Sequence, residues 1–210
     1  MKPLYLSYFI DANTPVYGGS KEVIQIKQLN SIEKGDTSNN LSVHFPVHIG
    51  THIDFPFHFS NTGKKSDDYP ASFWVFNKIG LIDCCIDEVP DKINLLPSDI
   101  EILILKTNFG IYRNENRYWS QQPVIPASYA DLFRSNFPKL RVFGFDMISL
   151  TSKLNRNEGK LAHINFLINN DILILEDMNL HGLQKTPDNI IIAPLQIIKA
   201  DGVPCNVIAF

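Results

Sequence analysis

Val47-His48-Ile49-Gly50-Thr51-His52-Ile53-Asp54-Phe55-Pro56-Phe57-His58-Phe59 is the stretch on which the fold of this chain depends. Three of the six histidines and one aspartate fall inside it, all at even positions. The odd positions between them are nearly all apolar. A period of two is typical of an extended segment that buries one face and presents the other. The stretch is therefore predicted to present imidazoles and a carboxylate from an extended backbone.

A helix would also bring His48 and His52 together, because they are four residues apart. Gly50, Pro56 and the β-branched residues oppose a helix, and the glutamate of the helical metalloprotease motif is missing. A straight strand would leave His48 and Asp54 about 20 Å apart, at roughly 3.3 Å per residue. Metal ligands must each come within about 2.0–2.2 Å of the ion. We therefore predict a bend at Gly50 and Pro56, and a metal site formed by the bent segment.

The composition indicates one globular domain spanning residues 1–210. Hydrophobic residues make up 44% of the chain and charged residues 20%, and the net charge is −3. This charge supplies no basic patch for nucleic acid or an anionic membrane. No apolar run approaches the ~20 residues of a membrane span, and the N-terminus lacks a signal-peptide pattern. With three cysteines, two of them adjacent, a disulfide framework is not expected, and we predict a cytoplasmic protein whose partner is a small-molecule substrate.

Periodicity predicts a strand-rich α/β fold with two clear helices. The helices are expected at 128–137, where Leu132, Phe133 and Phe137 share one side, and at 157–168. The apolar run within 100–106 is expected to be buried on both faces. Strands are predicted at residues 4–10, 23–26, 42–46, 81–89, 100–106, 140–146, 172–176, 190–198 and 203–210.

A metal site made only by residues 47–59 would be short of ligands. The best further candidates are His163, inside the predicted helix 157–168, and Glu176, at the end of an apolar strand. A carboxylate at the edge of a buried strand is costly unless it is paired or coordinated. From the residues alone, His163 could equally be a histidine packed in the core, and Glu176 could equally form a salt bridge. His44 is also at an even position, and we interpret it as a structural residue or as a support for the ligands.

These residues resemble the signature of a known family. The run His48-x-Gly50-Thr51-His52-x-Asp54-x-Pro56-x-His58 is similar to that of the cyclase family, which includes bacterial kynurenine formamidases and isatin hydrolases. Arg156-x-x-Gly159-x-x-Ala162-His163 and Ile174-Leu175-Glu176-Asp177-Met178-x-Leu180 resemble its second and third motifs. Gly144-Phe145-Asp146-x-x-Ser149 and Ala200-Asp201-Gly202-x-Pro204 also follow the pattern. The resemblance implies a swivelling β/β/α domain assembled as a homodimer or homotetramer.

The resemblance also implies a divalent metal cofactor, with two ions per subunit. His48, His52 and Asp54 would hold one ion, and Asp54 and Glu176 would bridge towards a second, which His163 would complete. Nitrogen and oxygen ligands without thiolate suit zinc or manganese. Two ions about 3.5–4 Å apart would activate a water molecule and polarise the substrate carbonyl.

His58 is assigned by this resemblance as the general acid/base. It would take a proton from the attacking water and return it to the leaving nitrogen or oxygen. In the alternative, His58 is a metal ligand and the site has no acid/base. The predicted activity is hydrolysis of an amide or formamide, with ring opening of a lactam or lactone as the alternative chemistry. A non-catalytic metal-binding scaffold is the competing hypothesis.

Three positions depart from the family pattern, and all of them concern the substrate. Tyr17 stands where kynurenine formamidases carry a tryptophan that stacks on the substrate ring. Thr107-Asn108 replaces a Thr-Gly, and Asn206 replaces an arginine. Tyr17 is therefore predicted either to pack on a substrate ring or to have an ordinary packing role. A hydrolase is a firmer prediction than any named substrate.

Overall fold

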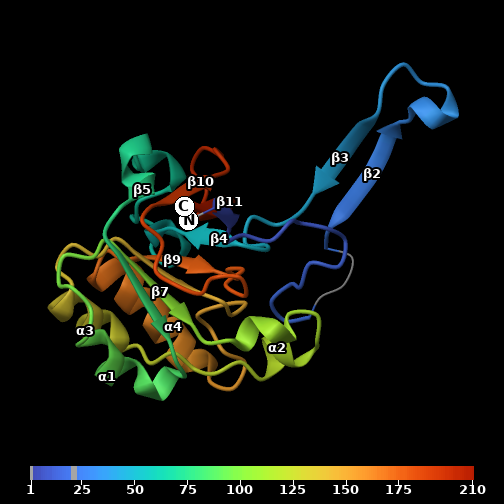
Figure 1. Ribbon diagram of the computed structural model, residues 1–210. Helices are drawn as coiled ribbons and strands as arrows, with labels where there is room; N and C mark the ends of the chain where they lie inside the picture. Colours follow the sequence, from blue (N-terminus) through green and yellow to red (C-terminus); the bar gives the residue numbers. More distant parts are fainter. Residues whose placement is uncertain (1, 20–22) are drawn as a thin grey trace.

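A computed structural model describes residues 2–19 and 23–210 (Figure 1). The strands are β1 (Leu4–Tyr5), β2 (Gln25–Asn30), β3 (Asn40–His44), β4 (His52–Asp54), β5 (Val75–Phe76), β6 (Ile79–Asp83), β7 (Ile102–Lys106), β8 (Val142–Phe145), β9 (Leu173–Glu176), β10 (Ile190–Pro194) and β11 (Gly202–Ala209). The α-helices are α1 (Val89–Ile93), α2 (Arg117–Ser120), α3 (Tyr129–Asn136) and α4 (Arg156–Ile164). The expectation of a strand-rich α/β fold with few helices is confirmed.

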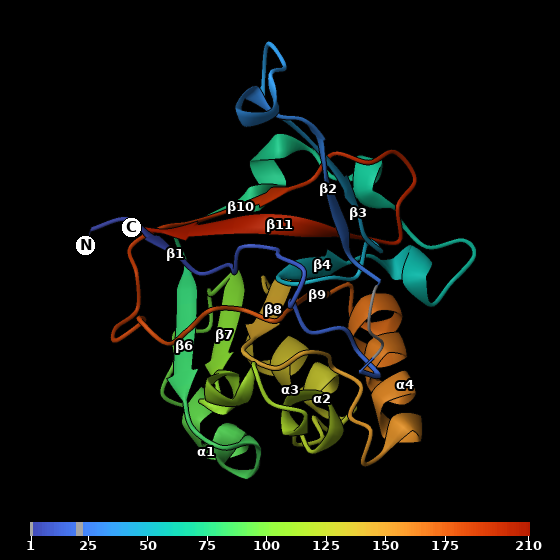
Figure 2. The same cartoon turned by 90° about the vertical axis from the view of Figure 1, so that its right-hand side faces the viewer.

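Nine of the described strands form one mixed sheet, in the order β5-β10-β11-β4-β9-β8-β7-β6, with β1 paired to β11. The run from β6 to β9 is parallel, and the pairs from β9 to β5 are antiparallel. In Figure 2, β10 and β11 cross the body of the molecule below the arm that β2, β3 and the turn between them form, and α1, α3 and α4 lie in the lower part of the body, near the parallel strands. Helices beside a parallel sheet allow its strands to be apolar on both faces. The predicted burial of the run at 102–105 is confirmed, because all four side chains are buried.

A cluster of phenylalanines joins the helices to the parallel strands. Phe143, on β8, lies 5.0 Å from the ring centroid of Phe133 on α3. The same ring stacks at 5.2 Å on Phe166, which belongs to the π-helical segment Asn165–Asn169 after α4. All three side chains are fully buried. This cluster holds α4 in place against the sheet.

The two predicted long helices form close to their expected positions, as α3 and α4. The side chain of Asn155 accepts a hydrogen bond from the backbone N–H of Glu158 at 3.1 Å, which caps the start of α4. Among the described residues, none of the helices has the length and apolarity that crossing a membrane requires.

The predicted strand at 81–89 is wrong in its second half. β6 ends at Asp83, a 3-10 turn follows at Ile86–Glu88, and α1 begins at Val89. Pro90 in the first turn favours the helix, since it lacks the N–H that a helix start leaves unpaired. Ile86, Val89 and Ile93 share one buried face at helical spacing.

Two other predicted strands are shorter than expected, and two short helices were missed. The strand expected at 4–10 is limited to Leu4–Tyr5, and the one expected at 190–198 ends at Pro194. Proline cannot donate to a strand ladder, which favours an end there. The short helices α1 and α2 were not predicted, because four or five residues are too few to show a period of 3.6.

The central stretch bends at both predicted residues. Gly50 has a φ of 57°, in the left-handed region that favours glycine. β4 follows at once, and Pro56 then begins a 3-10 turn that ends at His58. The bends let the extended segment turn its polar side chains towards one point.

Replacing Phe143 with alanine is expected to lower the free energy of unfolding by about 3–5 kcal/mol, because it removes a fully buried ring from the cluster. Urea unfolding followed by circular dichroism measures the change. Leu95→Ala is the matched control, since Leu95 is 79% exposed, and it should change stability by less than about 0.5 kcal/mol. Equal effects of the two substitutions would contradict the packing role of Phe143.

Candidate metal centre

The sheet register brings the acidic and imidazole groups of the site together. β4 lies between β9 and β11, so that His52 pairs directly with Glu176 and Asp54 pairs with Gly202. Directly opposite residues in an antiparallel pair present their side chains on the same face. His52, Asp54 and Glu176 therefore gather on one face of the sheet, although they come from distant parts of the sequence.

The carboxylates of Asp54 and Glu176 are buried and share two imidazole neighbours. The Nε2 atom of His52 lies 3.4 Å from Asp54 Oδ1 and 3.4 Å from Glu176 Oε2. The Nε2 atom of His163, on α4, lies 3.6 Å from Asp54 Oδ2 and 3.6 Å from Glu176 Oε1. Asp54 is 1% exposed and Glu176 is 3% exposed. Two buried carboxylates this close require positive charge beside them.

Backbone carbonyls orient two of the imidazoles. His52 Nδ1 donates to the carbonyl of Gly50 at 2.8 Å, and His163 Nδ1 donates to that of Gly159 at 2.8 Å. In both rings, this bond turns Nε2 towards the carboxylates and, once Nε2 has lost its proton, leaves it free to coordinate. Metal-binding histidines almost always have such a fixed second nitrogen. The two rings are therefore oriented as metal ligands would be.

His48 lies between two carboxylates. Its Nδ1 is 2.8 Å from Asp54 Oδ1, and its Nε2 is 2.9 Å from Asp201 Oδ2. The same oxygen of Asp201 accepts a hydrogen bond from His58 Nδ1 at 3.0 Å, and the His48 and His58 ring centroids are 4.1 Å apart. Gly202 makes room for His48, because a Cβ there would clash with the imidazole ring. Asp201 thus fixes both imidazoles through one oxygen.

Neighbouring carboxylates raise the pKa of the buried histidines. Burial lowers the pKa of His48, but hydrogen bonds to Asp54 and Asp201 overcome it and raise the pKa to about 9. Burial also lowers the pKa of His163, and Asp54 and Glu176 raise it to about 10. Burial raises the pKa of Asp54, yet the imidazoles hold that pKa well below its usual range. Protons on the imidazoles thus supply the positive charge that the carboxylates require.

The possible metal ligands form two overlapping groups among the described residues. One contains His48, Asp54 and His58, and the other contains His52, Asp54 and Glu176, with the ligand atoms of each group within 4.8 Å of one another. Asp54 belongs to both, as the bridging role implied by the family resemblance requires. These groups differ from the ligand sets that the resemblance implies in two ways. They place His52 with Glu176, and they include His58.

A cavity of about 270 Å³ borders these groups. The ring of Phe59 stacks on His163 at its wall, with centroids 4.6 Å apart. Tyr17 also lines the cavity, and its hydroxyl is buried. Burial raises the pKa of Tyr17, and the positive charge of Arg156 and a hydrogen-bonding interaction with its side chain oppose the rise. The cavity therefore offers a buried hydroxyl beside the imidazoles.

The structure brings together all the site residues that the sequence singles out. They line one cavity: Tyr17, His48, His52, Asp54, His58, His163 and Glu176. Their roles as ligands, acid/base and substrate contact stay predictions. His58 is exposed, whereas His52 and His163 are buried. His44 is exposed on β3 and pairs with Gln25 away from the cavity, so its interpretation as a support for the ligands is wrong.

Three groups that hydrogen-bond to the site residues were not predicted from the sequence. They are the carboxylate of Asp201, which binds two imidazoles, the Ser149 hydroxyl and the Leu150 N–H. The last two donate to Glu176 Oε1, at 3.2 Å and 2.5 Å. Asp201 and Ser149 both fall in segments that follow the family pattern, which was the signal available for them.

Comparison with known proteins identifies relatives over most of the chain. A kynurenine formamidase from Bacillus cytotoxicus is 30% identical over 181 residues, which cover 84% of this chain and 82% of that protein. Isatin hydrolase A from Labrenzia aggregata has a similar fold, with a TM-score of 0.82, 18% identity and coverage of 99% and 93%. A protein described as a potential metal-dependent hydrolase with cyclase activity gives a TM-score of 0.76, 20% identity and coverage of 99% and 96%.

A family model described as "Putative cyclase" matches residues 4–151, which is more than half of the 210 residues. The match includes the whole of residues 47–59, from which the site takes three imidazoles and a carboxylate. This chain belongs to the cyclase family.

Proposed function

We propose that this protein is a metal-dependent hydrolase that uses water to cleave the C–N bond of an amide or formamide. The observation that carries the proposal is the convergence of His48, His52, Asp54, His163 and Glu176 beside one cavity, with His58 exposed at the same place. Kynurenine formamidase relatives at 30% identity support the reaction type. The likeness to a described metal-dependent hydrolase supports the need for a metal.

The donor set fits divalent ions. Its atoms are imidazole nitrogens and carboxylate oxygens without a thiolate, which suits zinc or manganese. Following the family resemblance, His48, His52 and Asp54 would hold one ion, and Asp54, His163 and Glu176 a second. Bound ions would lower the pKa of water and polarise the substrate carbonyl. The ligand imidazoles must lose their protons for this to happen.

His58 is positioned to move the protons of the reaction. Its Nδ1 is bound to Asp201, which leaves Nε2 as the nitrogen that exchanges protons. His58 accepts a proton from the water as the water oxygen bonds to the carbonyl carbon, and then gives a proton to the nitrogen as the C–N bond breaks. Its exposure, unlike the burial of His52 and His163, supports this role over that of a ligand.

The cavity favours a small substrate with one polar group and one flat apolar group. The Tyr17 hydroxyl offers a hydrogen bond to a polar substituent, and the Tyr17 and Phe59 rings offer apolar surface. An N-formyl aryl amine meets this description. A cyclic aryl amide of the isatin type also does, and the fold likeness to isatin hydrolase A makes ring opening the second candidate reaction.

Purified protein is expected to hydrolyse N-formyl aryl amines, isatin-type lactams or aryl lactones, and to lose this activity when a chelator removes the metal. His58→Ala should lower kcat by about 10²–10⁴-fold, because it removes the acid/base, while the metal content stays that of the wild type. Absorbance assays and elemental analysis of the same samples measure both quantities.

His181→Ala is the control for this variant, since His181 is exposed and outside the cavity lining. Its turnover should equal that of the wild type. Loss of metal in His58→Ala would make His58 a ligand. A wild-type protein that binds metal but turns over none of the three substrate classes would favour the scaffold hypothesis.

Asp201→Asn is expected to weaken metal binding by about 10–100-fold, because Asp201 orients the ring of His48. It should also lower kcat, since the same oxygen holds His58 Nδ1. Metal affinity by competition with a chromophoric chelator separates the two effects. Asp99→Asn, which alters only a surface ion pair with Lys78, should leave both quantities unchanged. Wild-type metal affinity and turnover in Asp201→Asn would contradict the positioning role.

The metal-free protein is expected to lose stability as the pH rises from about 6.5 to about 10. The pKa values of His48 and His163 are raised from 6.5 to about 9 and about 10. A raised histidine pKa stabilises the fold fully below the unfolded value, and this contribution disappears as the pH passes the folded value. Urea unfolding across this range, with chelator present, measures the change. Stability that stays constant or rises would refute the ion-pair description of the cluster.

A further inference from the structure

A buried polar network joins the segment 113–122 to the cavity of the metal centre. At its centre is Asp177, which follows Glu176 in the sequence and also lines the cavity. The guanidinium of Arg113 donates to the Asp177 carboxylate through Nε at 2.9 Å and through a terminal nitrogen at 2.7 Å. The hydroxyl of Tyr118 donates to the same carboxylate at 2.6 Å. Two side chains of the segment therefore hold Asp177.

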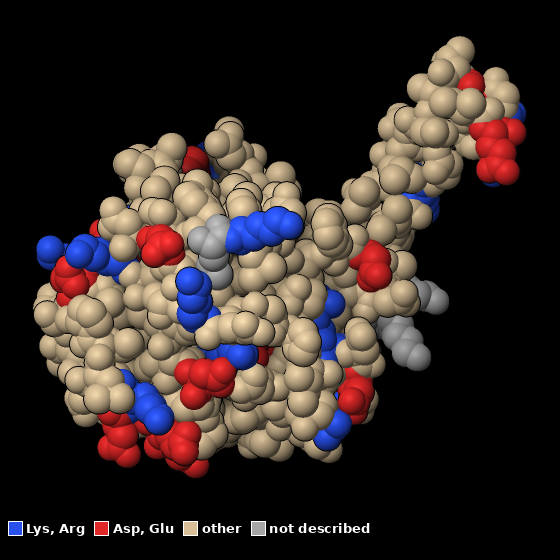
Figure 3. Space-filling view, in the orientation of Figure 1, with Lys and Arg blue, Asp and Glu red and all other residues tan. Residues whose placement is uncertain are grey.

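The ion pair between Arg113 and Asp177 is buried, unlike the charges on the surface. Basic and acidic side chains are scattered over the face of the molecule shown in Figure 3, and ion pairs at a surface contribute little, because water and salt screen them. The side chains of Arg113 and Asp177 are only 12% and 1% exposed. A guanidinium that binds a carboxylate through two hydrogen bonds fixes its geometry as well as its charge. This pair can therefore hold the neighbouring chain in one position.

The backbone of Asp177 turns sharply where β9 ends. Its φ is 50°, in the left-handed region that residues other than glycine rarely adopt. Such a conformation persists only where the surrounding contacts hold it. The N–H of Asp177 donates to the carbonyl of Met147 at 2.8 Å, and its carbonyl accepts the Thr51 hydroxyl at 2.5 Å. Asp177 is thus held by its backbone and its carboxylate, and it fixes the end of the strand from which Glu176 extends.

Gln122 provides a second connection to Glu176. Its side chain is fully buried, and its Nε2 donates to the carbonyls of Ser149 at 2.6 Å and Thr151 at 2.9 Å. These carbonyls belong to the loop whose Ser149 hydroxyl and Leu150 N–H donate to Glu176 Oε1. The amide of Gln122 therefore fixes the two groups that bind the glutamate carboxylate.

We infer that the segment 113–122 positions the metal ligand Glu176. Arg113 acts through Asp177, the residue that follows the ligand. Gln122 acts through the loop that donates to the ligand carboxylate. The inference rests on the proposed function, because it takes Glu176 as a ligand. Groups that orient the ligands of a metal ion change its affinity strongly, although they do not touch the ion.

Arg113 also keeps the carboxylate of Asp177 away from the metal centre. Asp177 lines the cavity together with Asp54 and Glu176. A third free carboxylate there would add negative charge to two buried carboxylates and would offer a competing oxygen ligand. The guanidinium of Arg113 occupies both oxygens of Asp177. Loss of Arg113 would therefore disturb both the geometry and the charge of the site.

The affinity for Zn²⁺, measured by competition with a chromophoric chelator, tests the inference. Arg113→Met and Gln122→Met remove the donors but keep a long side chain, and each should weaken Zn²⁺ binding by about 10–100-fold. Two matched controls come from the same segment. Arg117→Met removes an arginine that pairs with Glu115 on the surface, and Gln121→Met removes an exposed glutamine. Both controls should bind Zn²⁺ like the wild type.

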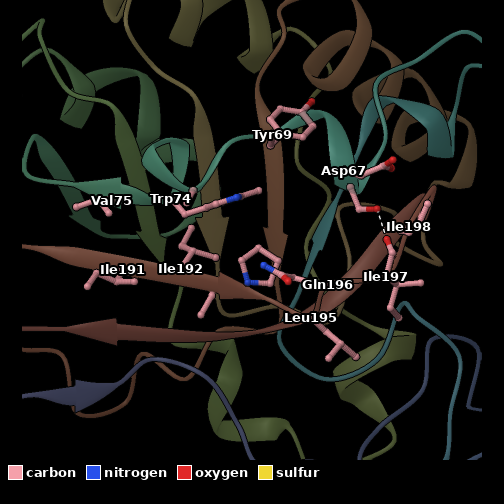
Figure 4. A pocket seen from close by; sticks show the side chains of 14 residues that line it. Asp67, Tyr69, Trp74, Val75, Ile191, Ile192, Leu195, Gln196, Ile197 and Ile198 are labelled. Carbon is pink, nitrogen blue, oxygen red and sulfur yellow. Dashed lines mark hydrogen bonds between the residues drawn. The ribbon is translucent and has the colours of Figure 1, made fainter.

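A destabilised variant separates positioning from a general loss of stability. Ile192, on β10, is 1% exposed and lines an apolar groove of about 620 Å³ (Figure 4). The described lining of this groove shares no residue with that of the metal-centre cavity. Ile192→Ala should lower the urea midpoint of unfolding, because it leaves a void in the core, yet it should bind Zn²⁺ like the wild type. Equal weakening of Zn²⁺ binding in Ile192→Ala and Arg113→Met would overturn the inference.

Asp177→Asn tests whether Arg113 acts through Asp177. Asparagine tolerates the left-handed backbone but carries no charge, so this variant also serves if Arg113→Met fails to fold. It should weaken Zn²⁺ binding by about 10-fold or more. The double variant should bind Zn²⁺ no more weakly than the weaker of the two single variants, because the two substitutions disrupt one interaction. Effects that add fully would overturn the connection through Asp177.

Two further results would decide against the inference. Wild-type affinity for Zn²⁺ in Arg113→Met, Gln122→Met or Asp177→Asn would overturn it and leave the proposed function intact. A wild-type protein that binds no divalent metal would overturn the proposed function together with the inference.

Discussion

The side chains of Asp54 and Glu176 are two carboxylates buried beside each other, and the surrounding structure is arranged to meet the cost of that burial. Like charges in a medium of low dielectric constant repel strongly unless cations lie between them. His52 and His163 each reach both carboxylates through Nε2, and His48 reaches Asp54. The imidazole protons balance the charge, and the same positions suit divalent ions, because a metal ion can replace several protons at once.

Within one short stretch, some of the polar side chains are buried and one is exposed. Gly50 turns the chain so that His52 and Asp54 enter the sheet between β9 and β11 and are buried. Pro56 then starts a turn that brings His58 back to the surface of the cavity. Buried, doubly anchored groups suit the fixed geometry of ligands, whereas an exposed imidazole with one free nitrogen suits proton exchange with water. Asp201 connects the two sets through a single oxygen atom.

The residues of the site were predictable from the sequence more completely than the bounds of the strands. Period-two alternation and the positions of Gly50 and Pro56 suffice for the bent strand, because these signals are local. The helical nature of 86–93 was missed, because apolar residues spaced for a strand over a few positions also fit one turn of a helix. The strands predicted at 23–26 and 42–46 are displaced, because β2 spans Gln25–Asn30 and β3 spans Asn40–His44. The polar residues of both strands gave no local signal for these bounds. Asp201 was passed over because an aspartate before a glycine is an ordinary turn residue.

The place of β4 in the sheet has a consequence for how the protein is made. Its two neighbours, β9 and β11, follow it by more than 100 residues in the sequence. A nascent chain thus exposes the histidine-rich segment on the ribosome well before any strand that can pair with it has been translated. Contacts of such long sequence separation form late and slowly. A chain that has not yet reached β9 therefore carries the histidine-rich segment without the strands that pair with it and complete its cavity.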